Sequence, residues 1–234
     1  MPISRRGFLG CAAGASAAGL TGAAGLGGLF ASSSRPQSGC LLVGLGQACP
    51  LSESAMGYAA ALSSSKIAFR QTSFRSFAFT SARTMILPGA VTVDLNSAAR
   101  LREHLVNGSN ILYESGAAFA SPREFGFHKR VIRTVFGLSL HDPVRLWDSA
   151  DSLKQSPYVD YHWPVVTKVR DFSRVIPVDP ADGGTIAWFR DLPVAASQKI
   201  GKGTLVYLGS PLGPHLLSGD REASGWLRKF CSSS

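Results

Sequence analysis

The sequence predicts an α/β protein, a three-layer sandwich with a central, mainly parallel sheet plus a C-terminal β-hairpin and helix. Strand and helix patterns alternate through the first half of the chain, which is typical of parallel strands joined by crossover helices. The run CLLVG at 40–44 is continuously apolar, as expected for a strand covered on both faces. After residue 138 the helical period is lost, and short apolar runs predict further strands.

The elements of the first half follow from apolar patterns and the residues that end them. After the first strand we expect a short helix at 56–62, a strand within 67–79, a buried strand at 84–87 ended by Pro88-Gly89, and a strand at 110–113. A helix at 94–106 separates the last two strands. It carries Ala98, Leu101 and Leu105 on one face, and Asn107-Gly108 ends it.

A second helix is predicted to begin at Ser121-Pro122-Arg123-Glu124, which has the capping-box pattern with Pro at the first helical position. We expect its buried face to carry Phe127, Val131, Ile132 and Val135 and its end to lie at Phe136-Gly137. Beyond it, the sequence predicts strands at 175–178, 185–189, 194–200 and 204–208, and a last helix capped by Asp220.

The first 34 residues predict a twin-arginine export signal. Residues 4–9 (SRRGFL) resemble the S/T-R-R-x-F-L consensus, in which Arg5, Arg6, Phe8 and Leu9 are the matching positions. The uncharged Ala/Gly stretch that follows is long enough to cross a bilayer but only weakly apolar. The alternative is a buried Ala/Gly helix preceded by two solvated arginines.

This interpretation divides the chain into a signal peptide at 1–34, a linker at 35–39 and one folded domain at 40–234. It predicts a periplasmic or secreted protein, or one anchored in the inner membrane if the signal stays uncleaved. The expected partners are the twin-arginine translocase during export and an unknown small molecule or envelope protein, with membrane contact only through an uncleaved signal.

Composition argues against several other functions. The net charge is +9, but the basic residues are scattered, which is typical of a solvated surface and argues against a nucleic-acid partner. Cys40, Cys49 and Cys231 lack the close Cys or His spacing of a metal site, and we interpret them as small buried hydrophobic residues. Gly44-Leu45-Gly46 lacks the third glycine of a nucleotide fingerprint, so neither a metal nor a cofactor is expected.

The order of elements from Cys40 to about Gly137 resembles the class I glutamine amidotransferase-like fold, a flavodoxin-like sandwich. The matching pieces are CLLVG (40–44), MILPGA (85–90), VNG (106–108) and ILYESG (111–116). GKGTLVYLGSPLG (201–213) with the helix after it resembles the close of related domains, including those similar to the N-terminal part of biotin-protein ligase. The resemblance implies a nucleophile elbow, C-x-G, after the strand at 110–113.

The elbow position departs from that family. Glu114 occupies the place of the cysteine, and a carboxylate is a poor acyl nucleophile that cannot form a thioester. The His-x-Glu pair of the family is not evident either, and His215 is the nearest candidate. We therefore expect no amidotransferase activity.

Candidate site residues lie where open α/β sheets place their ligands, beyond the carboxyl ends of strands. The catalytic candidates are Glu114, Ser115 and His215, and the ligand-cleft candidates are Gly89, Gly116 and Ser210. Structural roles are the alternative: Ser115 satisfying local backbone groups, Glu114 paired with an arginine, and His215 packed in a Pro/Gly loop. An aromatic cluster could stack on a sugar or a peptide, or pack over the sheet edge; it consists of Tyr158, Tyr161, His162 and Trp163.

Three functions follow as hypotheses. The first is an exported, non-catalytic amidotransferase-like domain that binds a ligand or protein partner in the cell envelope. The second is a degenerate hydrolase using Ser115 or Glu114 with His215. The third is a membrane-tethered accessory protein whose signal is not cleaved.

Overall fold

The computed structural model describes residues 39–44, 53–73, 82–90, 93–115, 119, 121–146, 157–171, 174–180 and 182–233. The expected export signal, with Arg5, Arg6, Phe8 and Leu9, lies outside these residues, as do Cys49 and Gly116. Among the described helices none is long and apolar enough to cross a membrane.

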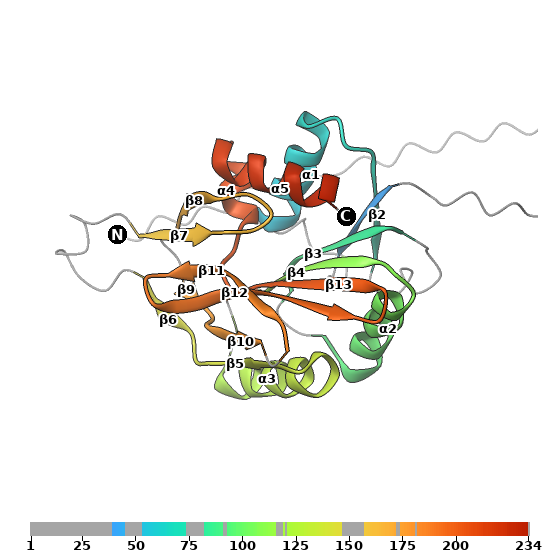
Figure 1. Ribbon diagram of the computed structural model, residues 1–234, viewed down its shortest axis with the longest axis vertical. Coiled ribbons are helices and arrows are strands. Elements are labelled where there is room, and N and C mark those ends of the chain that lie inside the picture. Colours follow the sequence, from blue (N-terminus) through green and yellow to red (C-terminus); the bar gives the residue numbers. More distant parts are fainter. Residues whose placement is uncertain are drawn as a thin grey trace, which may run out of the picture. The chain divides into compact units, whose positions relative to one another are not determined.

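One nine-stranded sheet dominates the fold, in the order β2-β1-β3-β4-β13-β12-β11-β7-β8 (Figure 1). Its parallel part consists of β2 (Phe69–Ser73), β1 (Cys40–Gly44), β3 (Thr84–Ala90), β4 (Asn110–Ser115) and β13 (Gly203–Leu208). Its antiparallel part adds β12 (Leu192–Ile200), β11 (Gly184–Phe189), β7 (Tyr158–Tyr161) and β8 (Thr167–Arg170). Two small antiparallel pairs accompany it: β5 (Leu138–Leu140) with β10 (Val178–Pro180), and β6 (Val144–Arg145) with β9 (Arg174–Val175).

The predicted fold class is wrong, because the sheet is mixed and not mainly parallel. Four strands, β12, β11, β7 and β8, continue the sheet in antiparallel pairing. Tight turns join β11 to β12 and β12 to β13, and antiparallel neighbours need no crossover helix. The hairpin expected as an addition at the C-terminus is therefore part of the main sheet.

Helices cover both faces of this sheet (Figure 1). One face carries α1 (Glu53–Ser64), α4 (Gly213–Leu217) and α5 (Arg221–Ser233), and we name it the α1/α5 face. The other carries α2 (Leu95–Val106) and α3 (Pro122–Phe136), and we name it the α2/α3 face. Each face has its own apolar core, because side chains alternate along every strand.

Both helices of the α2/α3 face begin and end at the predicted capping residues. The Asp94 side chain accepts from Ser97 N at 2.9 Å, and the Ser121 side chain accepts from Glu124 N at 3.2 Å. Gly137 ends α3 in the left-handed conformation, with φ of 76°.

The buried face of α3 differs from the predicted one. It consists of Phe125, His128, Val131, Ile132 and Phe136, whereas Phe127 is 37% exposed.

Two strands also run further than their turn residues predict. β3 continues through Pro88-Gly89 to Ala90, and β4 continues to Ser115, which brings the elbow residues into the sheet.

Candidate functional site

Glu114 and Ser115 are the last two residues of β4, and their side chains lie on opposite faces of the sheet. Successive residues of a strand alternate in direction, so Glu114 enters the α1/α5 face and Ser115 the α2/α3 face. Both residues have no exposed surface. The two predicted catalytic neighbours therefore belong to two different clusters.

Glu114 joins α1 and α4 to the sheet. Ser54 Oγ of α1 donates to Glu114 Oε1 at 2.5 Å. The backbone N–H groups of Leu212 and Gly213, at the start of α4, donate to Glu114 Oε2 at 3.1 and 2.9 Å. These charge-assisted bonds take the place of the arginine partner that the structural alternative expected.

Two glycines allow α1 and α4 to meet closely enough for this arrangement. A Cβ atom on Gly57 would lie 1.9 Å from Gly213 O, and one on Gly213 would lie 2.3 Å from Ser54 Cα. The backbones therefore touch, which only glycine permits at such a contact. The close approach lets Ser54 and Gly213 share one carboxylate.

Burial raises the pKa of Glu114, and hydrogen bonds from Ser54 and the α4 backbone, together with the nearby Tyr58 hydroxyl, oppose that rise. The Tyr58 hydroxyl faces the same carboxylate without good hydrogen-bond geometry. Burial also raises the pKa of Tyr58 well above its ordinary value, and the negative charge of Glu114 adds to this.

His215 belongs to a separate group around Asp171, which follows β8. Ser210 Oγ donates to Asp171 Oδ2 at 2.6 Å, and His215 Nε2 lies 3.9 Å from Asp171 Oδ1. The carboxylate therefore stands between the hydroxyl and the imidazole, whereas a Ser-His-Asp triad needs the imidazole in the middle. Among the described residues the contact of the His215 imidazole is with this carboxylate and not with Glu114 or Ser115.

Ser115 meets a histidine that the sequence analysis did not select. Ser115 Oγ lies 3.3 Å from His128 Nε2, and the same nitrogen lies 3.3 Å from Tyr207 Oη. Burial lowers the pKa of His128 to about 4, so its imidazole is neutral near pH 7. A neutral imidazole beside a serine hydroxyl is the arrangement of a general base and a nucleophile.

His128 could have been found from its position in α3. It lies three residues after Phe125 and three before Val131, on the apolar face of the helix. The neighbouring Lys129 and Arg130 made it look like part of a basic surface group. Asp171 gave no comparable signal, because it lies in a region without periodicity.

The remaining candidates divide between the two faces and the undescribed residues. Gly89 has φ of 58° within β3, and Ser210 is 3% exposed in the Asp171 group. Two members of the aromatic cluster pack against α5: Tyr161 and Trp226 have ring centroids 5.2 Å apart, and Trp226 Nε1 donates to Trp163 O at 2.8 Å. Tyr158 is 38% exposed, and His162 packs against Trp188. Within the described residues no three His, Cys, Asp or Glu side chains group as metal ligands.

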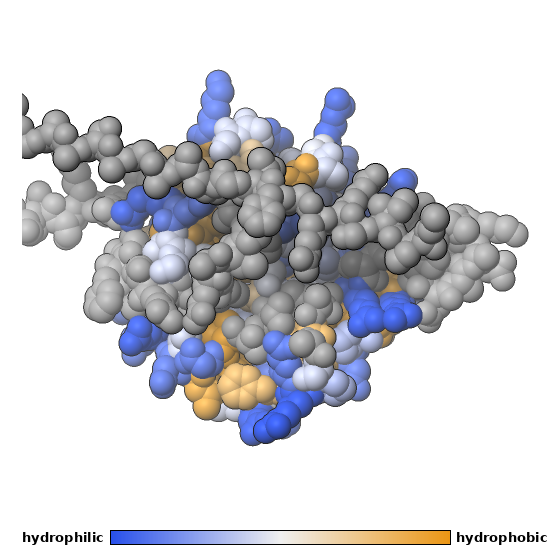
Figure 2. Space-filling view, turned by 180° about the vertical axis from the view of Figure 1, so that it is seen from behind, coloured by the Kyte–Doolittle hydropathy of each residue, from blue (hydrophilic) through white to orange (hydrophobic). Residues whose placement is uncertain are grey.

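A pocket of about 560 Å³ lies at the N-terminal end of α3, and we name it the Phe125 pocket. Its lining residues are Phe119, Ser121, Pro122, Phe125, Gly126, Lys129, Asp142, Pro143 and Arg174. The Phe119 and Phe125 rings are 4.9 Å apart, and Lys129 Nζ forms an ion pair with Asp142 Oδ1 at 3.1 Å. Figure 2 shows apolar side chains exposed among charged ones at the end of the view where α3 lies.

Phe119 and Phe125 also contact His128, with ring centroids 5.0 and 6.4 Å away. The two phenyl rings therefore lie between this pocket and the buried group of Ser115, His128 and Tyr207, which we name the Ser115 cluster. Ser115 and His128 are closed off at 0% and 1% exposure, respectively.

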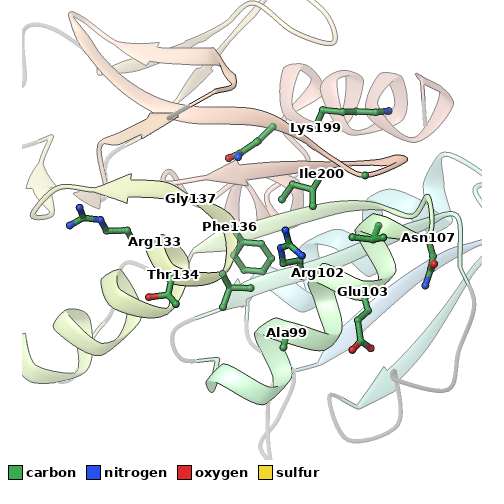
Figure 3. A pocket seen from close by; sticks show the side chains of 14 residues that line it. Ala99, Arg102, Glu103, Asn107, Arg133, Thr134, Phe136, Gly137, Lys199 and Ile200 are labelled. Atoms are coloured by element: carbon green, nitrogen blue, oxygen red, sulfur yellow. The ribbon is translucent and has the colours of Figure 1, made fainter.

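A larger groove of about 1020 Å³ lies at the other end of α3, between α2 and the β12–β13 turn (Figure 3). Arg102, Arg133 and Lys199 line it with Glu103. Arg133 is in the last turn of α3, where a positive charge offsets the helix dipole. The helix dipole of α3 is therefore a structural reason for the positive charge of Arg133 at that end of the groove.

Neither protein-family models nor curated proteins match this sequence. Solved structures match the fold. An exo-β-1,4-mannosidase from Opitutaceae bacterium strain TAV5 is 12% identical with a TM-score of 0.58, over 84% of this chain and 35% of that one. A β-galactosidase from Bacillus circulans sp. alkalophilus is 14% identical with a TM-score of 0.56, over 79% and 30%.

This chain spans about a third of the length of those glycosidases. A cytoplasmic protein of Salmonella typhimurium LT2 matches over nearly its whole length: 9% identity and a TM-score of 0.59, over 83% of this chain and 98% of that one. At such low identities the likeness establishes a shared fold and no shared activity.

These comparisons overturn the predicted family. The matching structures are parts of glycosidases and the Salmonella protein, so the resemblance to class I glutamine amidotransferases was wrong. Short motifs such as MILPGA and ILYESG describe strand ends of many α/β proteins and carry little family information. None of the matches supports the twin-arginine signal, and the location of the protein stays a prediction.

Proposed function

We propose that this chain is a non-catalytic domain that binds a saccharide in the Phe125 pocket. We propose that the domain is non-catalytic because of the burial and hydrogen bonding of Glu114. The residue is fully buried, and its carboxylate oxygens accept from Ser54, Leu212 and Gly213. An acid or base must come within hydrogen-bond reach of its substrate, and this carboxylate has no free surface for one.

The pocket offers the two kinds of contact that a saccharide uses. Phe119 and Phe125 provide ring surface for the apolar face of a sugar. Lys129 and Asp142 at the rim provide a donor and an acceptor for its hydroxyl groups. The matching mannosidase and galactosidase, of which this fold forms about a third, make β-mannosides and β-galactosides the first ligands to test.

Calorimetric titration with β-1,4-mannotriose and with a β-galactoside tests this proposal. We expect Phe119→Ala to weaken binding about tenfold, which corresponds to about 1.4 kcal/mol. The matched control is Arg133→Ala, which changes the groove at the other end of α3 and should leave binding unchanged. If both sugars fail to bind, or if Arg133→Ala weakens binding and Phe119→Ala does not, the saccharide pocket is refuted.

One observation favours a second function, a hydrolase. Ser115 Oγ lies 3.3 Å from a neutral imidazole, as a serine nucleophile requires. Phe119 and Phe125 stand between this pair and the pocket, so such an enzyme would have to move them. A fluorophosphonate probe distinguishes the two functions: labelling of Ser115 that is lost in His128→Asn would support the hydrolase, and we expect none.

A further inference from the structure

The Phe125 pocket carries more positive than negative charge. Among its described lining residues the cations are Lys129 and Arg174, and the only carboxylate is that of Asp142. This carboxylate is already paired, because Lys129 Nζ lies 3.1 Å from Asp142 Oδ1, and the same ammonium group lies 5.4 Å from the centroid of the Phe125 ring. The positive charge of Arg174 is therefore additional to the ion pair at the rim.

A second arginine reinforces that charge. β6 and β9 form a separate antiparallel pair (Figure 1), in which Arg145 lies directly opposite Arg174. Side chains at opposite positions project from the same face of such a pair, with Cβ atoms about 5 Å apart, and like charges there repel each other. Among the described residues no carboxylate forms an ion pair with Arg145. An anion bound by the two guanidinium groups relieves their repulsion.

The backbone at the pocket acts in the same direction. Ser121 and Pro122, at the start of α3, line the pocket, and α3 is 15 residues long. The N-terminal end of a helix carries a partial positive charge. Glu124 in the first turn offsets part of this charge but does not line the pocket. The helix therefore adds to the preference for a negative ligand that the arginines create.

We propose that the Phe125 pocket selects a saccharide with an anionic substituent, and that Arg174, supported by Arg145, binds the anionic group. This inference rests on the proposed function and names the class of saccharide. The sugar ring stacks on the two phenyl rings, its hydroxyl groups bond to the ion pair at the rim, and the anionic group reaches the arginines. A guanidinium group forms two parallel hydrogen bonds with an oxyanion, so a carboxylate, as in a uronic acid, and a sulfate ester both fit.

The test compares p-nitrophenyl β-galactosides that differ only at C6: the parent sugar with its hydroxymethyl group, the galacturonide with a carboxylate, and the 6-sulfate. Calorimetric titration of the full chain gives a Kd for each sugar, and the readout is the ratio of the parent's Kd to that of the anionic sugar. We expect a ratio of about ten for at least one anionic sugar, since a hydrogen bond to a charged group contributes about this much. A preference for the galacturonide alone identifies a carboxylate ligand, and a preference for the 6-sulfate alone identifies a sulfate ester.

Variants locate the charge that produces the preference. Arg174→Gln should bring the ratio to about one, and Arg145→Gln should lower it part of the way, because its charge acts from the neighbouring position. The matched control is Lys202→Gln, which removes one exposed positive charge at the β12–β13 turn and should leave the ratio unchanged. In about 1 M NaCl, where the Debye length is about 3 Å, the wild-type ratio should also fall. Both sugars are measured on the same protein, so a change in its stability does not alter the ratio.

The outcomes separate this inference from the proposed function. Equal Kd values for all the sugars on the wild-type protein overturn the inference and leave the saccharide pocket intact. A ratio that survives Arg174→Gln, or that Lys202→Gln lowers as much, overturns it too. If Arg174→Gln binds none of the sugars, Arg145→Gln decides, and an unchanged ratio in that variant is the contrary result. Absence of binding by every sugar to the wild-type protein refutes the saccharide pocket itself.

Discussion

The two faces of β4 treat neighbouring polar residues in different ways. On the α1/α5 face a carboxylate is buried among three donors at 2.5 to 3.1 Å. On the α2/α3 face a hydroxyl, an imidazole and a phenol are buried with contacts of 3.3 Å. A charge taken out of water needs several well-placed donors, whereas neutral groups tolerate looser partners.

The difference explains the architecture around each residue. Glu114 requires α1 and α4 to be held in one position, and the glycine contact between Gly57 and Gly213 makes that position possible. The Ser115 cluster needs no such fixed approach, and aromatic rings surround it. We therefore expect the carboxylate to serve the fold and the Ser115 cluster to fill a core.

Removal of the carboxylate should have the largest effect. Glu114→Ala leaves the Ser54 hydroxyl and two backbone N–H groups buried without an acceptor, and we expect a loss of about 3–5 kcal/mol in unfolding free energy. Urea denaturation followed by tryptophan fluorescence measures it. Glu114→Gln keeps an acceptor oxygen and should lose less; equal losses in the two variants would contradict the account.

Acid should destabilise the protein through His128 on the α2/α3 face. Because burial lowers the pKa of His128 to about 4, below its ordinary value of 6.5, the unfolded state binds more protons between these values. The stability from this group is present above pH 6.5 and is lost as pH falls toward 4, by up to about 3 kcal/mol. His128→Asn should flatten that part of the curve of unfolding free energy against pH, and an unchanged slope would argue against a buried neutral imidazole.

Glu114 should give the opposite trend. Its pKa is raised, so the stability that it contributes is present below its unfolded pKa and is lost as pH rises through the folded one. The difference between wild type and Glu114→Gln in unfolding free energy should therefore shrink with rising pH. A difference that grows would mean that the donors outweigh burial.

Replacing a glycine by alanine should change the unfolding free energy in opposite directions on the two faces of the sheet. Gly57→Ala places a Cβ 1.9 Å from Gly213 O, and overpacking of this kind costs about 1–3 kcal/mol. Gly126→Ala in α3 meets nothing within 4 Å and should stabilise by about 0.5–1 kcal/mol through helix propensity. Thermal denaturation of the two variants checks this, and a shift of the same sign in both would remove the distinction.

The smallest effect is expected at Ser115. Ser115→Ala removes the 3.3 Å contact with His128, and His128 keeps Tyr207 at the same distance, so the loss should be about 1 kcal/mol or less. A loss as large as that of Glu114→Ala, measured by the same urea series, would place the two residues in equivalent roles.

The local pattern of the sequence predicted the elements better than their assembly. The buried runs at 40–44 and 84–87 and the caps Asp94, Ser121 and Gly137 are local signals, and each lies where it was expected. The strands at 185–189, 194–200 and 204–208 and a C-terminal hairpin were predicted, but their place in the main sheet was missed, because hairpin strands of mixed polarity have no period that tells which strands pair. The partners of Glu114 come from Ser54 and Leu212-Gly213, far away in the chain, and no spacing rule could have connected them.

The central claim is that Glu114 and Ser115 serve the fold and not a reaction. The most direct test is the release of nitrophenolate from p-nitrophenyl β-galactoside, β-mannoside and acetate by wild type, Ser115→Ala and Glu114→Gln. The account predicts the same rate for all three proteins, because neither side chain has exposed surface. A wild-type rate above that of buffer that disappears in folded Ser115→Ala or Glu114→Gln would contradict it.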